Sequence, residues 1–404
     1  MINTLPDLID LIQQSKSPFH MVNVMKNLLK QFGYDEFTES CGISEKFFVI
    51  REGRSICIVK RRNSSKIRLI IASSDYHCFK NKPNTAQFSN GVSKARVCPY
   101  GSDIPLSKWK TWLDRNLSMC GRVVLKGEKS ETALFETGIV GFIPSVRGIL
   151  KIEEHTSPIM SLDDSLSIID PNQNPALMKA IANSLSITED LIMSAEISFI
   201  DAQNPCIYAD NTTMSGCGMS GISHAIMAFI SFIQSEMPED GTNMLCIFDG
   251  NLLEGVASYG AKSNFLSNII QCRDYSFDSI SRSFGVSLSP IPSQTKISTS
   301  EKCNIGDGPY LRNMHYRGLQ TDTSLNSELI MSVKNSGLSL GVYMPQSTDL
   351  TFNLENGAHI QMNLGIRMTS IGACAESLGS AREIVSLKDL TQLGDILKVF
   401  LKIK

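Results

Sequence analysis

Four continuous apolar runs along the chain have the pattern of strands that are buried on both faces. These runs lie at Leu69–Ala72, Met244–Phe248, Leu338–Met344 and Gly365–Ile371. Other stretches carry apolar residues at helical spacing, and they lie at Ile222–Ile233, Ser324–Val333 and Leu387–Leu401. Strands that alternate with helices in this way predict an α/β domain whose sheet has helices packed on both faces.

The N-terminal residues predict two consecutive helices. Thr4 with Asp7 forms a capping box ahead of the first helix. Ser17 and Pro18 supply an N-cap and a proline at the first helical position of the second helix, which Gly33 ends.

The stretch from about Val92 to Ile200 has shorter strand-like pieces separated by polar turns. Such pieces lie at Gly121–Leu125, Thr137–Ile143 and Ile149–Ile152. We therefore predict a mostly β domain inserted into the α/β domain. The length of 404 residues also favours two domains, because it exceeds what one hydrophobic core usually serves. The predicted segments are residues 1–92 and 201–404 for the α/β domain, with 93–200 as the insert.

Composition and charge narrow the class of protein. Hydrophobic residues make up 42% of the chain and charged residues 19%, as in an ordinary globular protein. The formal net charge is −2 and no basic stripe is interleaved with aromatic residues, so we predict no nucleic-acid partner. No apolar run is long enough to span a bilayer, so we expect no membrane partner.

The cysteines and the N-terminus bear on the cellular compartment. The N-terminal residues lack the basic region and apolar core of a secretory signal. The 11 cysteines are scattered singly without a C-x-x-C pair, and several, such as Cys57, Cys246 and Cys374, lie inside apolar runs. This pattern is typical of buried, reduced thiols, and we expect a cytoplasmic protein.

Several segments, taken in chain order, resemble the M18 family of aspartyl aminopeptidases. The segment Trp112–Ser118, followed by Gly121–Val124, is close to the family's W-L-D-R-D-L-S-x-x-G-R-V and is the most specific match. Less specific matches lie at Ser17–His20, Phe47–Val49, Asp201–Gln203, Leu364–Arg367 and Ser380–Glu383. These short segments appear in family order and are spread over nearly the whole chain.

The resemblance implies a peptidase domain in two chain segments, with a central mixed sheet flanked by helices and an inserted β-rich dimerisation domain. It also implies a dimer through the insert, a dodecamer of such dimers, and two zinc ions that serve the removal of N-terminal aspartate or glutamate. In that chemistry, a carboxylate and a water bridge the zinc ions, and a glutamate takes the proton of the water. Histidine and carboxylate side chains bind the metal.

Most positions that the resemblance assigns to this chemistry lack the required side chain. Ser73 stands at the position of a ligand histidine, whereas the supporting aspartate is kept as Asp75. Ser220 stands at the position of the bridging aspartate. Asn251 replaces the general base, and Leu252 replaces the next ligand.

Three further positions also lack the side chain that the resemblance expects. Gly285 stands where an aspartate ligand is expected, and Gly379 where the last histidine is expected. Ile149 occupies the position of the histidine that a neighbouring subunit lends to the substrate pocket. Loss of a general base alone typically costs about 10²–10⁴ in rate. We therefore predict a non-catalytic oligomeric scaffold or interaction protein, with no bound metal and no cofactor.

In two alternative interpretations, the protein binds a metal ion. The chain could be an active zinc aminopeptidase for N-terminal Asp or Glu that uses displaced ligands, for example Glu254. Asp75, His77 and Cys78 could form a relocated metal site, although such a pair of Asp and His more often forms a surface hydrogen bond.

A third alternative is a nucleotide site. Gly216, Gly218 and Gly221 match the spacing of a dinucleotide-binding loop, and Glu236 follows near the expected distance. That loop must follow a buried strand directly, whereas the residues before Gly216 are rich in turn formers. A tight turn before a helix is therefore the favoured interpretation.

Overall fold

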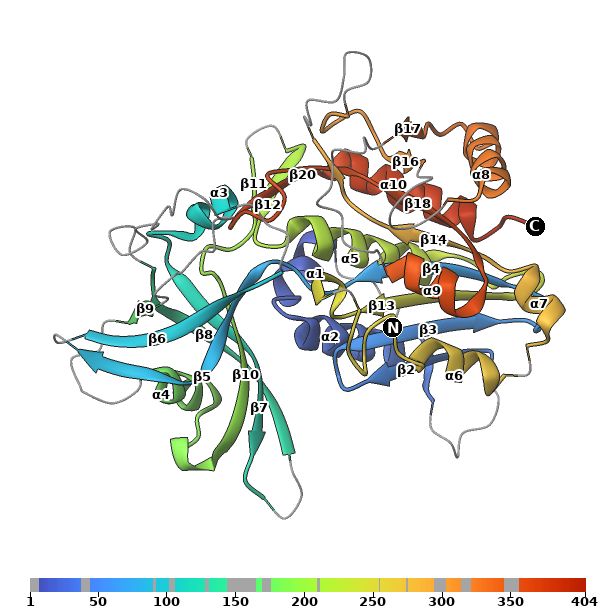
Figure 1. The fold of residues 1–404 in the computed structure, drawn as a ribbon. Helices are drawn as coiled ribbons and strands as arrows, with labels where there is room; N and C mark the ends of the chain where they lie inside the picture. Colours follow the sequence, from blue (N-terminus) through green and yellow to red (C-terminus); the bar gives the residue numbers. More distant parts are fainter. Residues whose placement is uncertain are drawn as a thin grey trace, which may run out of the picture.

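The computed structural model describes residues 7–37, 44–89, 92–101, 106–127, 131–143, 165–168, 176–208, 211–253, 255–273, 275–293, 303–313, 321–344 and 356–404. Within these ranges the chain forms three sheets, and helices cover the largest of them (Figure 1).

The largest sheet has nine strands and is mixed. In spatial order the strands are β1 (Asp35–Glu36), β2 (Lys46–Arg51), β3 (Ser55–Arg61), β13 (Thr242–Phe248), β4 (Ile67–Ser73), β14 (Phe284–Leu288), β18 (Arg367–Gly372), β16 (Tyr310–Arg312) and β17 (Gly341–Tyr343). The central strands β13, β4, β14 and β18 run parallel, whereas β3 and β16 run antiparallel to their neighbours β13 and β18. The predicted central mixed sheet is confirmed.

The α-helices flank the sheets. They are α1 (Leu8–Gln14), α2 (Pro18–Gln31), α3 (Leu106–Trp109), α4 (Ala176–Leu185), α5 (Met219–Gln234), α6 (Phe265–Gln271), α7 (Phe277–Ser281), α8 (Thr323–Asn335), α9 (Asn356–Leu364) and α10 (Leu387–Phe400).

Alternate residues of β4 pack into two different hydrophobic clusters, because successive residues of a strand point to opposite faces. Ile70 and Ala72 belong to the cluster that contains residues of α5, α8 and α10. Leu69 and Ile71 belong to the opposite cluster, with residues of α6 and α9. The prediction of helices on both faces of the sheet is therefore confirmed.

The ends of the N-terminal helices follow local capping rules. Ser17 accepts a hydrogen bond from the backbone N–H of His20 and caps α2, which has Pro18 at its first position, as predicted. In α1, Asp7 itself is the N-cap and accepts from Asp10, so the helix starts at Leu8. Thr4, the predicted partner of Asp7, lies outside the described residues.

A six-stranded sheet forms the β-rich part of the molecule, at the left of Figure 1. In spatial order its strands are β8 (Glu131–Gly141), β7 (Leu117–Leu125), β10 (Ile192–Asp201), β5 (Cys78–Ser89), β6 (Val92–Tyr100) and β9 (Ser165–Ile168). Because β5 pairs with both β10 and β6, the predicted boundary at residue 92 cuts through this sheet. Ile149–Ile152, the third predicted piece, lies outside the described residues.

The two tryptophans pack against the start of this sheet. The ring of Phe79 in β5 lies 4.9 Å from the ring of Trp109 and 5.5 Å from the ring of Trp112, centroid to centroid. Both indole side chains are buried. They therefore pack β5 against the end of α3, which contains Trp109, and against the residues just after it, which contain Trp112.

A small sheet of five strands joins distant parts of the chain. In spatial order its strands are β11 (Cys206–Ile207), β12 (Thr213–Gly216), β20 (Glu383–Ser386), β19 (Cys374–Glu376) and β15 (Ile291–Pro292). The predicted strand at Leu338–Met344 is shorter in the structure, where only β17 is extended. It pairs with one neighbour, β16, and Val342 is 42% exposed, so this edge strand is not buried on both faces.

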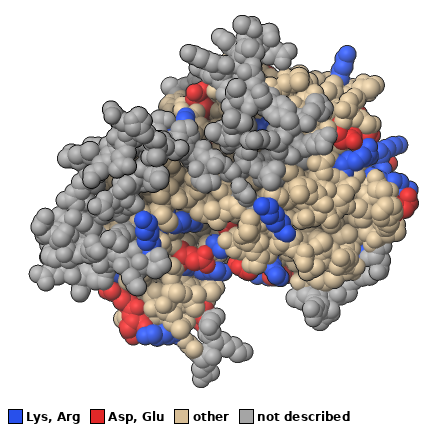
Figure 2. Space-filling model, in the orientation of Figure 1, with Lys and Arg blue, Asp and Glu red and all other residues tan. Residues whose placement is uncertain are grey.

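Surface and sequence features of the described residues agree with a globular chain. None of their helices has the length and apolar character needed to cross a bilayer. The cysteines among them form no disulfide, although Cys57 and Cys246 face each other with 3.2 Å between the Sγ atoms. On the face shown in Figure 2, basic and acidic side chains of the described residues are interspersed, without an extended area of one sign.

Candidate functional site

The carboxyl ends of two neighbouring parallel strands bring several predicted site residues together. Ser73, the last residue of β4, pairs with Phe248, the last residue of β13. Asp75 lies just beyond β4, whereas Asn251 and Leu252 begin the short 3-10 helix η4 (Asn251–Leu253) just beyond β13. Ligand sites of α/β sheets usually lie at the carboxyl ends of parallel strands.

Asn356, the first residue of α9, bridges two of these positions. Its Nδ2 donates to Ser73 Oγ at 3.1 Å, and its backbone N–H donates to Asn251 Oδ1 at 3.2 Å. Asn356 is only 2% exposed. A neutral amide thus connects the positions where the resemblance expects a zinc ligand and the general base. Asn356 is separated from Ser73 by 283 positions, and no local signal in the sequence relates the two residues.

Asp75 is buried and uses one oxygen for both of its hydrogen bonds. Its Oδ2 accepts from the backbone N–H of Leu252 at 2.9 Å and from the hydroxyl of Tyr100 at 3.2 Å. Its Oδ1 is buried and has no hydrogen-bond donor among the described residues. Burial first, and then the charge of nearby Asp249, raise the pKa of Asp75 to about 7, because both disfavour the charged form. Asp75 therefore fixes η4 next to the end of β4.

Asp249 is a second buried carboxylate, and Arg54 neutralises it. Arg54 Nε lies 2.8 Å from Asp249 Oδ2. The guanidinium of Arg54 also stacks between the rings of Phe19 and Tyr259, with 4.5 and 4.1 Å to the centroids. Burial raises the pKa of Asp249, whereas the positive charge of Arg54 opposes that rise. The protein itself thus supplies the cation for this carboxylate.

Ser220 and Gly379 are joined through Glu383, a residue that sequence reasoning had not assigned to the site. The two carboxylate oxygens of Glu383 accept from the backbone N–H of Ser220 at 2.8 Å and from that of Gly379 at 2.7 Å. Burial raises the pKa of Glu383, whereas these N–H donors lower it. Because each oxygen faces a donor, the geometry favours the charged form. The carboxylate occupies the N-terminus of α5, where an anion is stabilised.

Gly285 does not lie with the other predicted site residues. It is the second residue of β14 and pairs with Leu69. At about 3.3 Å per residue, it lies on the order of 13 Å from the strand end at Ser73. Ser287 is the residue of β14 that packs closely against α9. If Gly357 of α9 carried a Cβ atom, this atom would lie 2.6 Å from the Cβ of Ser287. Gly285 thus lies away from the strand ends that carry Ser73, Asn251 and Leu252. Ile149 and Glu254 lie outside the described residues.

The described residues around His77 form no alternative metal site. His77 packs against Gly101, where an added Cβ would lie 2.5 Å from His77 Cδ2. Burial lowers the pKa of His77 to about 4. In the described part of the chain, no group of three or more His, Cys, Asp or Glu side chains is placed to hold a metal ion. Asp75, His77 and Cys78 therefore do not form the relocated site that their spacing suggested.

The glycine loop forms a tight turn. Gly218 has a φ of 66° and is the N-cap of α5, and a Cβ on it would lie 2.5 Å from Tyr76 Cγ. The strand before the loop, β12, belongs to the five-stranded sheet and not to the nine-stranded sheet. Since Glu383 already fills the N-terminus of α5, the position that a pyrophosphate would need is taken.

The side chains at the strand ends do not fit a pair of zinc ions. Zinc prefers histidine nitrogen, cysteine sulfur and carboxylate oxygen. Among the predicted positions of the described chain, only Asp75 carries such a group, and its Oδ2 is held by Leu252 and Tyr100. Ser73 and Asn251 are bonded to Asn356, and Leu252 has no ligand atom in its side chain.

Comparisons with known proteins agree with this architecture. A sequence model described as "Aminopeptidase I zinc metalloprotease (M18)" matches residues 11–401. The probable M18 family aminopeptidase 2 of Borreliella burgdorferi is 24% identical over 423 residues, which cover 96% of each chain. The aspartyl aminopeptidase of Caenorhabditis elegans is 23% identical over 306 residues, which cover 66% of this chain and 64% of the relative.

Among solved structures, the dodecamer of aminopeptidase Ape1 from the yeast S. cerevisiae superimposes with a TM-score of 0.81 at 17% identity. The superposition covers 97% of this chain and 95% of the yeast chain. The fold therefore has metallopeptidase architecture with a β-rich insert. The chain belongs to the M18 family of aminopeptidases.

Proposed function

We propose that this M18-family chain is a non-catalytic relative that acts as an oligomeric scaffold or interaction protein. The observation that carries the proposal is the Asn356 bridge, in which Ser73 and Asn251 bond to an amide where zinc chemistry needs a ligand and a base. Asn251 Oδ1 accepts the backbone N–H of Asn356, and an amide oxygen is far too weak a base to take a proton from water.

The remaining acidic groups support the same proposal. Asp249 is paired with Arg54, and Glu383 is bonded to the backbone of Ser220 and Gly379. A carboxylate that the protein itself satisfies has little free energy to gain from binding a cation. Asp75 keeps one free oxygen, and one carboxylate is not enough to hold two metal ions.

Assembly with itself is the proposed retained property. The Trp112–Ser118 segment, the family's most specific match, leads into β7 of the six-stranded sheet. We propose a dimer through this sheet and a dodecamer of dimers, by analogy with the yeast relative, which is a dodecamer. The buried, free thiols of Cys57, Cys78 and Cys120 support a cytoplasmic location.

The second candidate is an active zinc aminopeptidase for N-terminal Asp or Glu, with displaced ligands. It is favoured by the buried, unpartnered Oδ1 of Asp75 at the strand end and by the name of the Caenorhabditis elegans relative. This candidate needs further ligands from residues outside the described ranges.

Elemental analysis and a hydrolysis assay distinguish the two candidates. We expect the purified protein to contain no zinc and to release no N-terminal aspartate or glutamate, even with added zinc, manganese or cobalt. The combined variant S73H/S220D/N251E/L252E should bind metal where no single change does, because such a site acts as a unit. Adding G379H belongs in a separate variant, since Gly379 has a φ of 77° that strains a side chain. Two metals per unmodified chain, or turnover of an acidic substrate, would establish the active enzyme instead.

A further inference from the structure

Two cysteines face each other inside the nine-stranded sheet. Cys57 of β3 and Cys246 of β13 are directly paired in the antiparallel β3–β13 ladder, and their Sγ atoms lie 3.2 Å apart. Residues that are paired in this way point to the same face of a sheet, and here both belong to the cluster that contains residues of α6 and α9. Both side chains are fully buried. The two thiols therefore form a close, enclosed pair.

The backbone geometry of this pair matches that of a disulfide bond. The Cα atoms of directly opposite residues in an antiparallel ladder lie about 4.5–5.5 Å apart, and disulfide bonds join residues whose Cα atoms are roughly 4.4–6.8 Å apart. Since a disulfide bond is about 2.0 Å long, the sulfur atoms of Cys57 and Cys246 need to approach each other by only about 1 Å. The ladder can therefore accept this bond without a change of register.

In the closed sheet these thiols react poorly with oxidants. Burial first, and then the hydrogen bond with Cys57, raise the pKa of Cys246 well above its ordinary value. The thiolate is the reactive form of cysteine, and solvent does not reach either side chain. Oxidation of the pair therefore requires local opening of the β3–β13 ladder, and native proteins undergo such openings at a free energy no higher than that of global unfolding.

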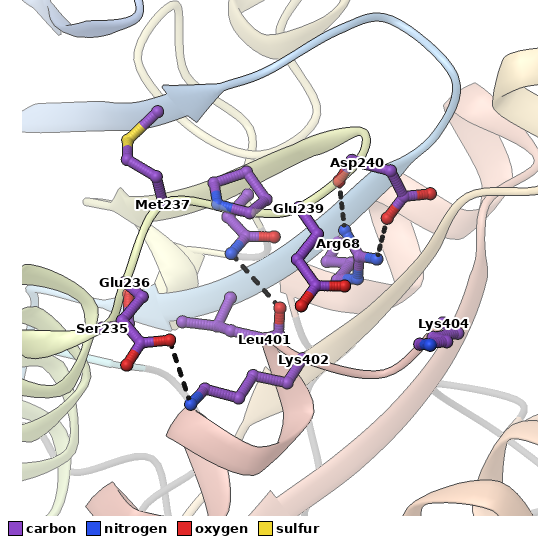
Figure 3. A pocket seen from close by; sticks show the side chains of 11 residues that line it. Arg68, Ser235, Glu236, Met237, Glu239, Asp240, Leu401, Lys402 and Lys404 are labelled. Atoms are coloured by element: carbon purple, nitrogen blue, oxygen red, sulfur yellow. Dashed lines mark hydrogen bonds and ion pairs between the residues drawn. The ribbon is translucent and has the colours of Figure 1, made fainter.

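The pair lies where two parts of the sheet meet. Strands β1, β2 and β3 form the N-terminal part, whereas β13, β4, β14 and β18 form the parallel part. Arg68 of β4 holds the parallel part together where β13 begins, because it donates to the backbone O and to Oδ1 of Asp240 at 2.9 and 2.7 Å (Figure 3). A bond between Cys57 and Cys246 would join the two parts covalently and close a loop of 189 positions, which contains the whole insert.

We propose that Cys57 and Cys246 form a reversible disulfide bond when a peroxide reaches the locally opened ladder. Hydrogen peroxide oxidises one thiol to a sulfenic acid, and its O–O bond breaks with release of one water molecule. When the ladder closes, the second thiol attacks the sulfenic sulfur, the S–O bond breaks, and a second water molecule leaves. The two thiols thereby lose two hydrogen atoms, and one hydrogen peroxide is reduced to two water molecules.

The disulfide bond would act next to the candidate functional site. Ser55, two residues before Cys57, accepts a hydrogen bond through Oγ from the backbone N–H of Asp249 at 2.9 Å. Asp249 follows Cys246 by three residues. Covalent linkage of β3 to β13 therefore keeps this end of the ladder closed, and reduction by a thiol releases it.

Peptide mapping by mass spectrometry after treatment with hydrogen peroxide tests the proposal. The purified full chain is treated at a urea concentration below its unfolding transition, its remaining thiols are alkylated, and it is digested without reductant. We expect the peptides of Cys57 and Cys246 to be linked, with two hydrogen atoms fewer than the separate peptides. The equilibrium constant of unfolding should fall about a hundredfold, because closure of a long loop restricts the unfolded chain. Dithiothreitol should reverse this shift.

Cys272→Ser is the matched control, because it removes an exposed thiol and should leave both the linkage and the shift unchanged. Cys246→Ala should show no such shift on oxidation, and the peptide map of the unmodified protein tests the linkage without any variant. The proposal is overturned if peroxide converts Cys57 and Cys246 into sulfinic or sulfonic acids without linking them, or links other cysteines in their place. It is also overturned if the linked protein unfolds at the same urea concentration as the reduced protein.

Discussion

At the scale of single residues, Asp75 has the most unusual electrostatic environment of the strand ends. Burial and Asp249 raise its pKa from 3.8 to about 7. Between about pH 4 and pH 7, the folded protein therefore holds a proton that the unfolded chain has released. In this window the free energy of unfolding falls as the pH rises, because the charged form of Asp75 is disfavoured only in the folded state.

The variant Asp75→Asn removes this titration while keeping an acceptor for Leu252. We expect the wild type to lose more stability than the variant between about pH 5 and pH 8, measured by urea unfolding at each pH. Asp35→Asn changes an exposed carboxylate in β1 and should follow the wild type. If the free energy of unfolding depends on pH in the same way for the wild type and for Asp75→Asn, Asp75 is not the titrating group.

At the scale of elements, Glu383 connects the N-terminus of α5 to the loop between β19 and β20. In Glu383→Gln, one amide nitrogen must face the N–H of Ser220 or Gly379, so one bond is lost and two donors meet. We expect a loss of about 2 kcal/mol in the free energy of unfolding. Urea unfolding measures this loss.

Glu376→Gln is the matched control, because Glu376 lies in the neighbouring strand β19 and is only partly buried. Its effect should stay within about 0.5 kcal/mol, as for most surface substitutions. If both glutamine variants unfold at the same urea concentration as the wild type, the cap of α5 does not depend on the charge of Glu383.

At the scale of the whole molecule, we propose that assembly depends on the surface of the insert. Ile139 on the edge strand β8 is 64% exposed, and an apolar side chain of this kind on an open strand favours contact with another chain. We expect the purified protein to form a large, discrete particle by light scattering, and Ile139→Asp to reduce its mass. Phe277→Asp changes a side chain that is 90% exposed on α7 and should leave the particle intact. A monomeric wild type would contradict the scaffold proposal.

Removal of metal by a chelator tests the proposal that the whole molecule folds without bound zinc. A fold that depends on bound metal loses its binding free energy on chelation, about 4 kcal/mol at a thousandfold excess over Kd. Since Ser73, Asn251 and Leu252 at the strand ends are not side chains that zinc prefers, we expect EDTA to leave the thermal midpoint unchanged. A clear fall in the midpoint, reversed by zinc, would mean that residues outside the described ranges complete a metal site.

The sequence alone determined the layers of the fold. The alternation of Leu69 and Ile71 with Ile70 and Ala72 fixed which residues face which helical layer, because strand geometry makes neighbours point apart. Ser17 likewise determined the start of α2, since a cap acts on N–H groups only two or three residues away. The sequence also predicted that the side chains of Ser73, Ser220, Asn251 and Gly379 do not bind zinc.

Only the tertiary structure decided which partners the hydrogen-bonding groups at these positions have. Asn356 reaches Ser73 across 283 positions, and Glu383 reaches Ser220 across 163. The distance of Gly285 from the strand ends follows from the pairing of β14 with β4, and the residues of β14 alone do not determine that pairing. Local patterns follow from backbone geometry over a few residues, whereas these contacts exist only when distant segments pack together. The sequence therefore showed which side chains stand at these positions, and packing decided which neighbours they bond to.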